Sequence, residues 1–424
     1  MKDLWAVLVR RRDYRLVLSA GLISLTGDWI LRTGLAFHVY TLTGSTLASG
    51  GLLLASFVPL VVLGSLAGVF VDRWDRRRTM IVVNLLHAIV LLPLLAVRDE
   101  SGLWLVYVIV LAQSCLQQFF RPAEQSLVPH LVDPQQLITA NALNSQSNDI
   151  ARLVGAALGG VLAATGGMPL LAAVDAATYL LATALLLGVR HRAMAVMRER
   201  TKGAVRRLRA EWVDGLRICV GGRAMRIVFV FGLVTGVGEG AMSTLFAPFV
   251  SEELGGDSTA YGLIVSAQAV GGIVGGLVAA AVGARFAAAR LWGAGAVLFG
   301  LIDLALFCYP LVYDGLAPAY VLMIAVGLPG AFVVAASMTV VQRLTDDASR
   351  GRVFGALFAA EGLAVLVGIV AAGLLGEVVG IIPILVVQGL GFTAGGLVVL
   401  ARSNLLERKP VLSASPPARR GPGA

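Results

Sequence analysis

Long apolar segments separated by short polar turns recur along the whole chain. A helix rises about 1.5 Å per residue, so an apolar run of roughly 18–25 residues is long enough to cross a bilayer. The pattern therefore predicts membrane-spanning helices throughout, and an even number of them places both termini on the same side of the membrane. The twelve expected spans are 16–40, 45–71, 80–97, 103–120, 141–165, 169–189, 226–249, 259–284, 291–310, 318–341, 353–378 and 383–401.

The composition agrees with this pattern. The 424 residues are 58% hydrophobic and only 14% charged, with a mean hydropathy of +0.84. Soluble domains carry about 25% charged residues, so the chain is predicted to be an all-α membrane protein. Many of its 50 glycines lie inside apolar segments, where glycine lets neighbouring helices approach closely. The first apolar run starts near Leu16 and exceeds signal-peptide length, so we expect no cleaved leader.

Positive charge is distributed unevenly among the turns. If the N-terminus lies in the cytoplasm, all but three of the 34 Lys and Arg residues fall in cytoplasmic segments, and the exceptions are Arg32, Arg98 and Arg152. Because positively charged loops stay on the cytoplasmic side, we expect both termini there. The net charge of +9 then indicates contact with anionic lipids at the cytoplasmic face and not binding of nucleic acid.

The longest turn is strongly basic and divides the chain. We expect an N-terminal six-helix half at 1–189, a basic cytoplasmic linker at 190–225, a C-terminal six-helix half at 226–401 and a disordered cytoplasmic tail at 402–424. Within the linker, the segment from Arg198 to Leu216 is compatible with an amphipathic helix on the inner leaflet. A solvated basic segment is the alternative.

The two halves repeat one another at a shift of about 212 residues, which is half the chain length. Three separate regions give nearly this shift. The matched positions are Arg15, Gly21, Leu22, Gly27 and Asp28 with Arg226, Gly232, Leu233, Gly238 and Glu239; Gly64, Arg73 and Arg78 with Gly276, Arg285 and Arg290; and Val154, Gly155 and Gly160 with Val367, Gly368 and Gly373. Two parallel six-helix repeats are an arrangement found in membrane transporters.

Residues that carry enzyme chemistry are sparse and scattered. The three cysteines, Cys115, Cys219 and Cys308, are far apart, and the four histidines, His38, His87, His130 and His191, form no cluster. Motifs for nucleotide binding and hydrolysis are absent from the sequence. We therefore expect no enzymatic activity, no metal site and no organic cofactor.

A dense charge cluster joins the second and third spans. The segment Gly68-x-x-x-Asp72-Arg73-x-Asp75-Arg76-Arg77 resembles the loop motif of major facilitator transporters, which usually has glycine at the position of Asp75. The resemblance implies that Gly68, Asp72, Arg73, Arg76 and Arg77 form a cytoplasmic gate. Asp72 would then lie at the start of the eleventh span, near Val353, where the helix dipole favours an anion.

Further stretches are similar to the macrolide-efflux and enterobactin-exporter branch of that superfamily. They are Gly27-Asp28-Trp29, Phe119-Phe120-Arg121-Pro122-Ala123, Asn141-Ala142-Leu143, Gly155-Ala-Ala-Leu-Gly159-Gly160 and Arg350-Gly351-Arg352-Val353-Phe354. The resemblance covers residues 10–400. It implies a multi-pass protein of the bacterial inner membrane, a drug:proton antiporter whose first, fourth, seventh and tenth spans line a central cavity.

The fifth span carries the antiporter pattern in altered form. The matching residues are Arg152, Gly155, Gly159 and Gly160, whereas Ala156 replaces the usual proline. We expect these glycines, with those at 271–276 and 368–373, to pack tightly at the interface between the halves.

The fourth span departs from the family as well. Many drug antiporters carry a basic residue midway along it, and here Gln113, Gln117 and Gln118 occupy the span. A proton-coupling scheme that needs that basic residue is therefore not transferable to this chain.

Ionisable residues inside spans are functional candidates because each costs at least ~2.5 kcal/mol to insert. Asp28 and Arg32 lie four residues apart on one helical face. They form either a neutralised pair or a cavity pair that substrate or proton rearranges. The same alternatives hold for Asp149 and Arg152 on the fifth span.

Glu239 has no basic neighbour within one helical turn. As the repeat partner of Asp28, it is expected to face Asp28 across the cavity near the midplane. Glu239 and the equally unpaired Glu361 are candidates for proton exchange. The alternative for Glu239 is that it caps backbone freed at a glycine-rich kink. Asp175 and Asp303 are expected to be packing residues of outer helices.

Aromatic residues are expected on the inner faces of the cavity helices. Trp29, Phe37, Phe119 and Phe246 are candidates for an apolar wall that binds substrate. The alternative is that they pack between helices or face lipid.

Together these features predict a secondary active exporter of an amphipathic small molecule, such as a drug, siderophore or natural product. It would work by alternating access and proton antiport, with the proton gradient as energy source. A lipid or lysophospholipid flippase of the same fold is the alternative. We expect a monomer whose partners are its substrate, protons and anionic lipids.

Overall fold

The computed structural model describes residues 11–71, 74–97, 100–133, 136–190 and 204–407. This part of the chain folds into helices and turns, with no strand among the described residues. The helices are α2 (Arg12–Thr43), α3 (Thr46–Val71), α4 (Arg76–Leu91), α5 (Leu103–Leu127), α6 (Leu137–Leu187), α7 (Ala204–Gly221), α8 (Arg223–Pro248), α9 (Ser258–Val282), α10 (Ala288–Cys308), α11 (Ala317–Leu344), α12 (Asp347–Val379), α13 (Ile381–Ala401) and α14 (Ser403–Glu407).

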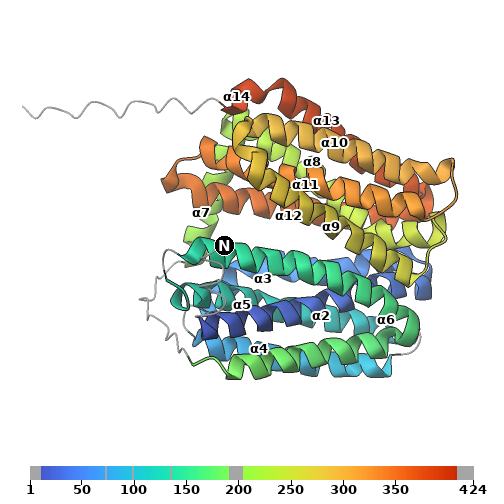
Figure 1. The fold of residues 1–424 in the computed structure, drawn as a ribbon. Helices are drawn as coiled ribbons and strands as arrows, with labels where there is room; N and C mark the ends of the chain where they lie inside the picture. The colour runs from blue at the N-terminus through green and yellow to red at the C-terminus, as the bar shows by residue number, and fades with distance from the viewer. Residues whose placement is uncertain (1–10, 72–73, 98–99, 134–135, 191–203, 408–424) are drawn as a thin grey trace, which may run out of the picture.

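The helices form two bundles that lie side by side with α7 at one end of the boundary (Figure 1). One bundle holds α2 to α6 and the other holds α8 to α14. We call the end that carries α7 and α14 the linker end. The opposite end, where α2 turns into α3, is the distal end.

The helix packing repeats between the bundles. In the N-terminal bundle α2 packs on α6, α3 on α5, and α4 on α6; in the C-terminal bundle α8 packs on α12, α9 on α11, and α10 on α13. The bundles meet where α6 contacts α9 and where α3 contacts α12. The repeat relates α3 to α9 and the first segment of α6 to α12, so it converts one of these contacts into the other. The structure therefore bears out the relation between the halves that the sequence predicted.

Two pairs of glycines mark the interface between the bundles. A Cβ on Gly160 of α6 would lie 3.0 Å from Cα of Gly262 in α9, and a Cβ on Gly50 of α3 would lie 3.5 Å from Cα of Gly373 in α12. Both contacts bring two helix backbones together without side chains between them. The two pairs are related by the repeat.

The other predicted interface glycines pack within a bundle. A Cβ on Gly155 would meet Trp29 of α2, and a Cβ on Gly159 would meet Ile30. Similarly, Gly271 and Gly275 of α9 pack on α11, and Gly368 packs on α8. The expectation that all of these glycines lie between the halves is therefore wrong, because adjacent glycines on one helix face different neighbours.

Among the described residues, ten helices are long and apolar enough to cross a membrane. One of them, α6, contains Gly167 with φ 58° and ψ −155°, where the chain turns sharply between two helical segments. Its two segments match the predicted spans 141–165 and 169–189. Helix α2, which carries Asp28 and Arg32, is not among the ten but matches the predicted span 16–40. The arrangement is consistent with twelve spans.

The charge cluster after α3 is partly described. Gly68 lies within α3, whereas Asp72 and Arg73 lie outside the described residues. The Asp75 carboxylate accepts a hydrogen bond from the backbone N–H of Arg78 at 2.8 Å and so caps the start of α4. Asp75, at the position where the resembled motif usually has glycine, is therefore a favourable N-cap residue.

The arginines of this cluster contact the N-terminal bundle itself. Arg77 donates hydrogen bonds to the carbonyl oxygens of Leu186 and Leu187, at 2.9 and 2.7 Å, in the last turn of α6. The Arg76 guanidinium lies 2.7 Å from the His130 ring nitrogen Nε2. These contacts fix the end of α6 and the α5–α6 turn at the linker end.

Helix α7 forms within the predicted linker and packs on α8 and α12. Its Asp214 pairs with Arg352 of α12 at 3.3 Å. The predicted disordered tail at 402–424 is wrong for its first residues, because Ser403–Glu407 form α14 with Leu406 buried. Residues 408–424 lie outside the described part of the chain.

Candidate functional site

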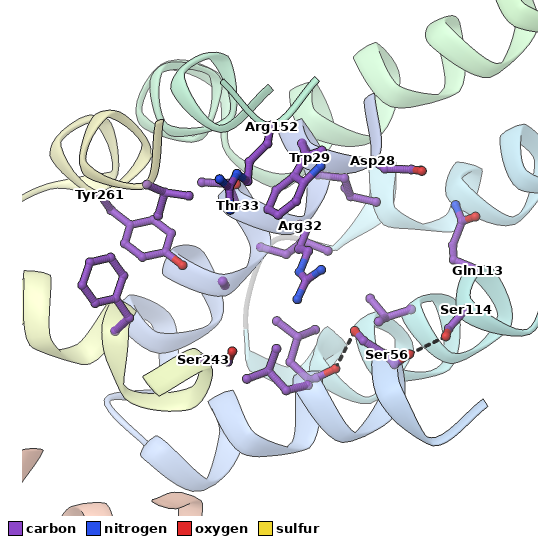
Figure 2. Close-up of a pocket in the computed structure, with 18 of the residues that line it drawn as sticks. Asp28, Trp29, Arg32, Thr33, Ser56, Gln113, Ser114, Arg152, Ser243 and Tyr261 are labelled. Atoms are coloured by element: carbon purple, nitrogen blue, oxygen red, sulfur yellow. Dashed lines mark hydrogen bonds between the residues drawn. The ribbon is translucent and has the colours of Figure 1, made fainter. Parts of the chain in front are cut away.

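A cavity of about 340 Å³ lies between the two bundles. The N-terminal bundle contributes side chains from α2 to α6 and the C-terminal bundle contributes side chains from α8 to α11. The lining combines apolar and aromatic surface with a few polar and charged groups, as is usual for small-molecule sites. Figure 2 shows this cavity with side chains that line it.

Asp28 points away from Arg32 (Figure 2). Its carboxylate accepts a hydrogen bond from the hydroxyl of Tyr179 on the second segment of α6. The Tyr179 ring lies 4.5 Å from the ring of His87 on α4. Asp28 and Arg32 therefore do not form the neutralised pair that their spacing allowed. Asp28 instead belongs to a polar cluster between α2 and the second segment of α6.

Asp175 belongs to the same cluster. It is fully buried, and its carboxylate accepts a hydrogen bond from the Thr178 hydroxyl at 3.2 Å. A Cβ on Gly27 would collide with both side chains, so Gly27 is what lets α6 bring them against α2. Asp175 also lines the cavity. The expectation that it only packs in an outer helix is therefore too narrow.

The C-terminal bundle has a related buried pair. The Gln388 side-chain amide of α13 donates a hydrogen bond to the Asp303 carboxylate of α10 at 3.2 Å, and both residues are buried. Here the structure agrees with the packing role expected for Asp303. Gln388 lies 213 residues after Asp175, a separation that matches the repeat shift. Each bundle therefore has a buried polar residue at the same position of its last spanning helix.

Arg32 projects into the cavity. Its guanidinium carbon lies 5.3 Å from the Trp29 ring centre and 5.7 Å from the Phe57 ring centre, distances at which a cation is attracted to an aromatic face. No carboxylate in the described residues forms an ion pair with it. The cavity therefore holds a fixed positive charge that leaves room for an anionic or polar partner.

Glu239 faces this charge from the C-terminal bundle. It lines the cavity and, among the described side chains, no group forms a hydrogen bond or ion pair with it. Arg32 and Arg152, both from the N-terminal bundle, interact with it electrostatically. The expectation that Glu239 faces Asp28 is thus corrected, because Asp28 turns towards Tyr179 and the groups opposite Glu239 are two arginines.

Glu361 lies beside the cavity and does not line it. Its backbone and Cγ atoms pack on Gly236 of α8, one turn from Glu239. Arg152 does line the cavity, and one of its terminal nitrogens lies 3.4 Å from a Cβ position on Gly272 of α9. Its guanidinium therefore reaches the C-terminal bundle, and no ion pair joins it to Asp149 in the described chain.

Of the four aromatic residues that were predicted to form an apolar wall of the cavity, two line it and two do not. Trp29 and Phe246 line the cavity. Phe37 is buried, with its ring centre 5.6 Å from that of Tyr261, and Phe119 stacks on Trp74 at 6.0 Å near the linker end. Those two residues therefore pack and do not face the cavity.

Several lining residues escaped the sequence analysis. Among them are His87, Tyr179, Tyr261, Gln268 and Phe299. Phe57, whose ring lies near Arg32, was not predicted either. Gln113 and Gln117 of the fourth span also line the cavity. The sequence gives no signal for most of these positions, because an aromatic residue in an apolar helix looks the same whether it faces a cavity or lipid.

Comparisons with known proteins show the family of the chain. The sequence profile of the transmembrane secretion effector family, a group of major facilitator transporters, matches residues 4–415. The chain belongs to this family. It is a multi-pass membrane transporter and not an enzyme.

Relatives of this transporter include proteins named for efflux or transport. An uncharacterized MFS-type transporter, YfiS of Bacillus subtilis, is 26% identical over 93% of this chain and 94% of its own length. The staphyloferrin A transporter of Staphylococcus aureus is 21% identical over 88% and 91%. Macrolide efflux protein A of Streptococcus pyogenes is 28% identical over 36% of this chain and 38% of its own length.

Solved structures share the fold. A peptide transporter called POT superposes with a TM-score of 0.75 at 12% identity, over 93% of this chain and 95% of that chain. At this identity the likeness shows the major facilitator fold and nothing about substrate.

Proposed function

We propose that this transporter is a proton-coupled exporter of amphipathic small molecules and resides in the bacterial inner membrane with both termini in the cytoplasm. The observation that carries the proposal is the arrangement of charge in the cavity. Glu239 of one bundle has no bonded partner among the described residues, and it interacts electrostatically with Arg32 and Arg152 of the other bundle. A proton on Glu239 would remove the attraction between the bundles, and its release would restore it.

The lining supports an amphipathic substrate. Aromatic and apolar side chains, including Trp29 and Phe246, offer surface to an apolar body, while Arg32 and the glutamines of α5 offer polar contacts. Macrolide efflux and siderophore transport in relatives favour the same substrate class.

Contacts at the distal end support alternating access. Ser45 donates a hydrogen bond to Glu377 at 2.8 Å, Thr46 donates one to the carbonyl oxygen of Gly373 at 3.0 Å, and Tyr40 bonds to Glu252. All three join the two bundles. With the linker end in the cytoplasm, these bonds close the outer end, and rocking of the bundles would break them.

The test is accumulation in an efflux-deficient bacterial host. Cells expressing the full chain are loaded with a macrolide, a catecholate siderophore or a fluorescent amphipathic cation, with and without a protonophore. We expect lower accumulation of at least one compound, and we expect the protonophore to remove the effect. Glu239→Gln should lose the protonophore-sensitive part.

The matched control is Glu253→Gln, which makes the same change on an exposed residue at the distal end. It should transport as the native chain does. Full proton-driven export by Glu239→Gln would overturn the coupling role of Glu239. Export of none of the compounds, together with movement of a fluorescent phospholipid between leaflets, would overturn the substrate class in favour of the flippase.

A further inference from the structure

A second cavity, of about 640 Å³, opens on the outer side of the C-terminal bundle. It is a groove between α8 and α13, which pack on each other. Its lining is Arg223, Arg226, Ile227, Val230, Phe231, Val234, Gly391, Ala394, Gly395, Val398, Arg402 and Leu405. It shares no lining residue with the central cavity, so it is a separate site.

The groove is positive at one end and apolar along the rest. Arg223 begins α8, Arg226 lies one turn further, and Arg402 follows the end of α13, so the three arginines meet at the linker end. Below them the walls are aliphatic, and Val230, Val234 and Val398 are 45–51% exposed. This polarity matches a molecule with an anionic head and an apolar chain.

The arginines are available to a ligand. Arg226 is held in place, because its Nε and one Nη donate hydrogen bonds to the Val220 carbonyl oxygen at 3.1 and 3.0 Å at the end of α7. Neither Arg223 nor Arg402 forms an ion pair with a carboxylate of the described chain, and both are exposed. Three positive charges therefore converge without a negative one to balance them.

The depth of the groove fits one leaflet of a bilayer. From Arg223 to Val234 the helix rises roughly 16 Å, at about 1.5 Å per residue. The hydrocarbon core of a bilayer is about 30 Å thick, so one leaflet contributes about 15 Å. A lipid whose headgroup lies at the arginines would thus place its chains beside the aliphatic part of the groove.

Small residues leave the apolar part of the groove uncovered. Gly391 and Gly395 bring α13 close to Val234 and Phe231, since a Cβ on either glycine would come within about 3 Å of these side chains. Ala394 is exposed between them. No bulky side chain of α13 therefore blocks an acyl chain at this level.

Charge argues against the two longest undescribed segments of the chain as occupants. Residues 408–424 contain Arg408, Lys409, Arg419 and Arg420 and no Asp or Glu, and residues 191–203 contain more basic than acidic residues. Like charges would repel them from the three arginines. A molecule that binds in the groove must therefore itself carry the negative charge that balances the three arginines.

We propose that the groove between α8 and α13 binds an anionic phospholipid, with its phosphate at Arg223, Arg226 and Arg402. Binding there is independent of the transported substrate, because the groove does not reach the central cavity. Each arginine near a membrane surface contributes about 1 kcal/mol towards an anionic lipid. Arginine also suits phosphate because its planar group donates several hydrogen bonds at once.

The test is lipid titration of the purified full chain, followed by native mass spectrometry. Phosphatidylglycerol and phosphatidylcholine are compared on the native protein, on Arg223→Gln/Arg402→Gln and on Arg285→Gln/Arg290→Gln. The last variant removes two arginines from the same end of the bundle, away from the groove. We expect the native protein and this control to prefer phosphatidylglycerol. The groove variant lacks two of the three arginines and should bind it about thirtyfold more weakly.

A second variant tests the apolar part. Ala394→Leu fills the groove and leaves all three arginines in place, so it should also weaken phosphatidylglycerol binding. Elution of each variant as a single species checks its folding. Equal affinity for both lipids, or equal weakening in the control variant, would overturn the proposal. Competition by free glycerol phosphate as strong as that by the lipid would overturn the phospholipid in favour of a soluble phosphate.

Discussion

The hydroxyl of Tyr179 donates a hydrogen bond to the carboxylate of Asp28. This bond joins α2 to the second segment of α6 and determines which way the Asp28 side chain turns. It leaves Arg32, one helical turn away, free to face the cavity (Figure 2). Which charged side chains face the cavity therefore depends on Tyr179, an uncharged residue of the cavity lining.

Removing this hydroxyl should destabilise the N-terminal bundle. In Tyr179→Phe, the half-buried Asp28 carboxylate loses its bonded partner, which costs about 1–3 kcal/mol. We expect a lower midpoint of thermal unfolding in detergent. Tyr313→Phe, on an exposed tyrosine, is the control and should leave the midpoint unchanged. An unchanged midpoint in Tyr179→Phe would show that this bond does not stabilise the bundle.

Two substitutions of Arg32 distinguish the effect of its positive charge from the effect of its planar shape. Arg32→Lys keeps the positive charge opposite Glu239, while Arg32→Gln removes it. If attraction to Glu239 is what matters, the lysine variant should export nearly as well as the native chain and the glutamine variant should lose export. Accumulation assays in the efflux-deficient host measure this. Equal loss in both variants would mean instead that the planar contact with Trp29 and Phe57 is what export requires.

The glycine contact between α6 and α9 should be intolerant of side chains. In Gly160→Ala, the new Cβ would lie 3.0 Å from Gly262 Cα and closer still to the Ser258 carbonyl oxygen, so α6 and α9 must separate. We expect a cost of about 1–3 kcal/mol in stability.

The control is Gly276→Ala on α9, where no atom lies within 4 Å of the added Cβ. Alanine is favoured over glycine in a helix by about 0.5–1 kcal/mol, so this variant should be as stable as the native chain or more so. Thermal unfolding of both variants compares them directly, and equal midpoints would contradict the interface role of Gly160.

The distal end should be lockable by a disulfide. Gly50 and Gly373 face each other across the interface, with each Cβ position 3.5–3.7 Å from the other Cα. The two Cα atoms are therefore well within the limit of about 7 Å beyond which a disulfide cannot form without backbone movement. In a chain without Cys115, Cys219 and Cys308, Gly50→Cys/Gly373→Cys should stop export when oxidised and recover it when reduced. Either cysteine alone should be insensitive to oxidant, and full export by the crosslinked protein would exclude opening at the distal end.

The cap of α4 gives a local prediction about the departure from the family motif. Asp75→Ala should destabilise the fold by about 1 kcal/mol, because the Arg78 N–H loses its acceptor. Asp75→Asn keeps an acceptor and should be near the native stability, and Asp75→Gly, the family's usual residue, should cost only a few tenths of a kcal/mol. Thermal unfolding measures all three, with Asp314→Ala on an exposed turn as control.

Much of the fold follows from the sequence, because in a membrane the apolar length of a segment alone indicates a spanning helix. The repeat shift likewise predicted which helices correspond, and the packing of α6 on α9 and of α3 on α12 follows that correspondence. The predicted disordered tail at 402–424 was an exception, because its first residues form α14. Residues 403–407 look like a polar end in the sequence, and they are helical because Leu406 finds a buried position in the C-terminal bundle.

The site was less predictable than the fold. Spacing along one helix showed that Asp28 and Arg32 share a face, but it could not show that Tyr179, 151 residues away, competes for the carboxylate. The same limit applies to Glu239. Its lack of a local partner was visible in the sequence, whereas the arginines opposite it come from the other half of the chain.

The short helix α14 has a practical consequence for handling this protein. The Glu407 carboxylate accepts a hydrogen bond from the Ala289 N–H at 2.7 Å and pairs with Arg343 at 3.0 Å, so it joins the start of α10 to the end of α11. An affinity tag or fluorescent fusion placed directly after Ala401 would remove this connection. Fusions and truncations for purification belong after Glu407, so that this connection between α10 and α11, the last one in the described part of the chain, is retained.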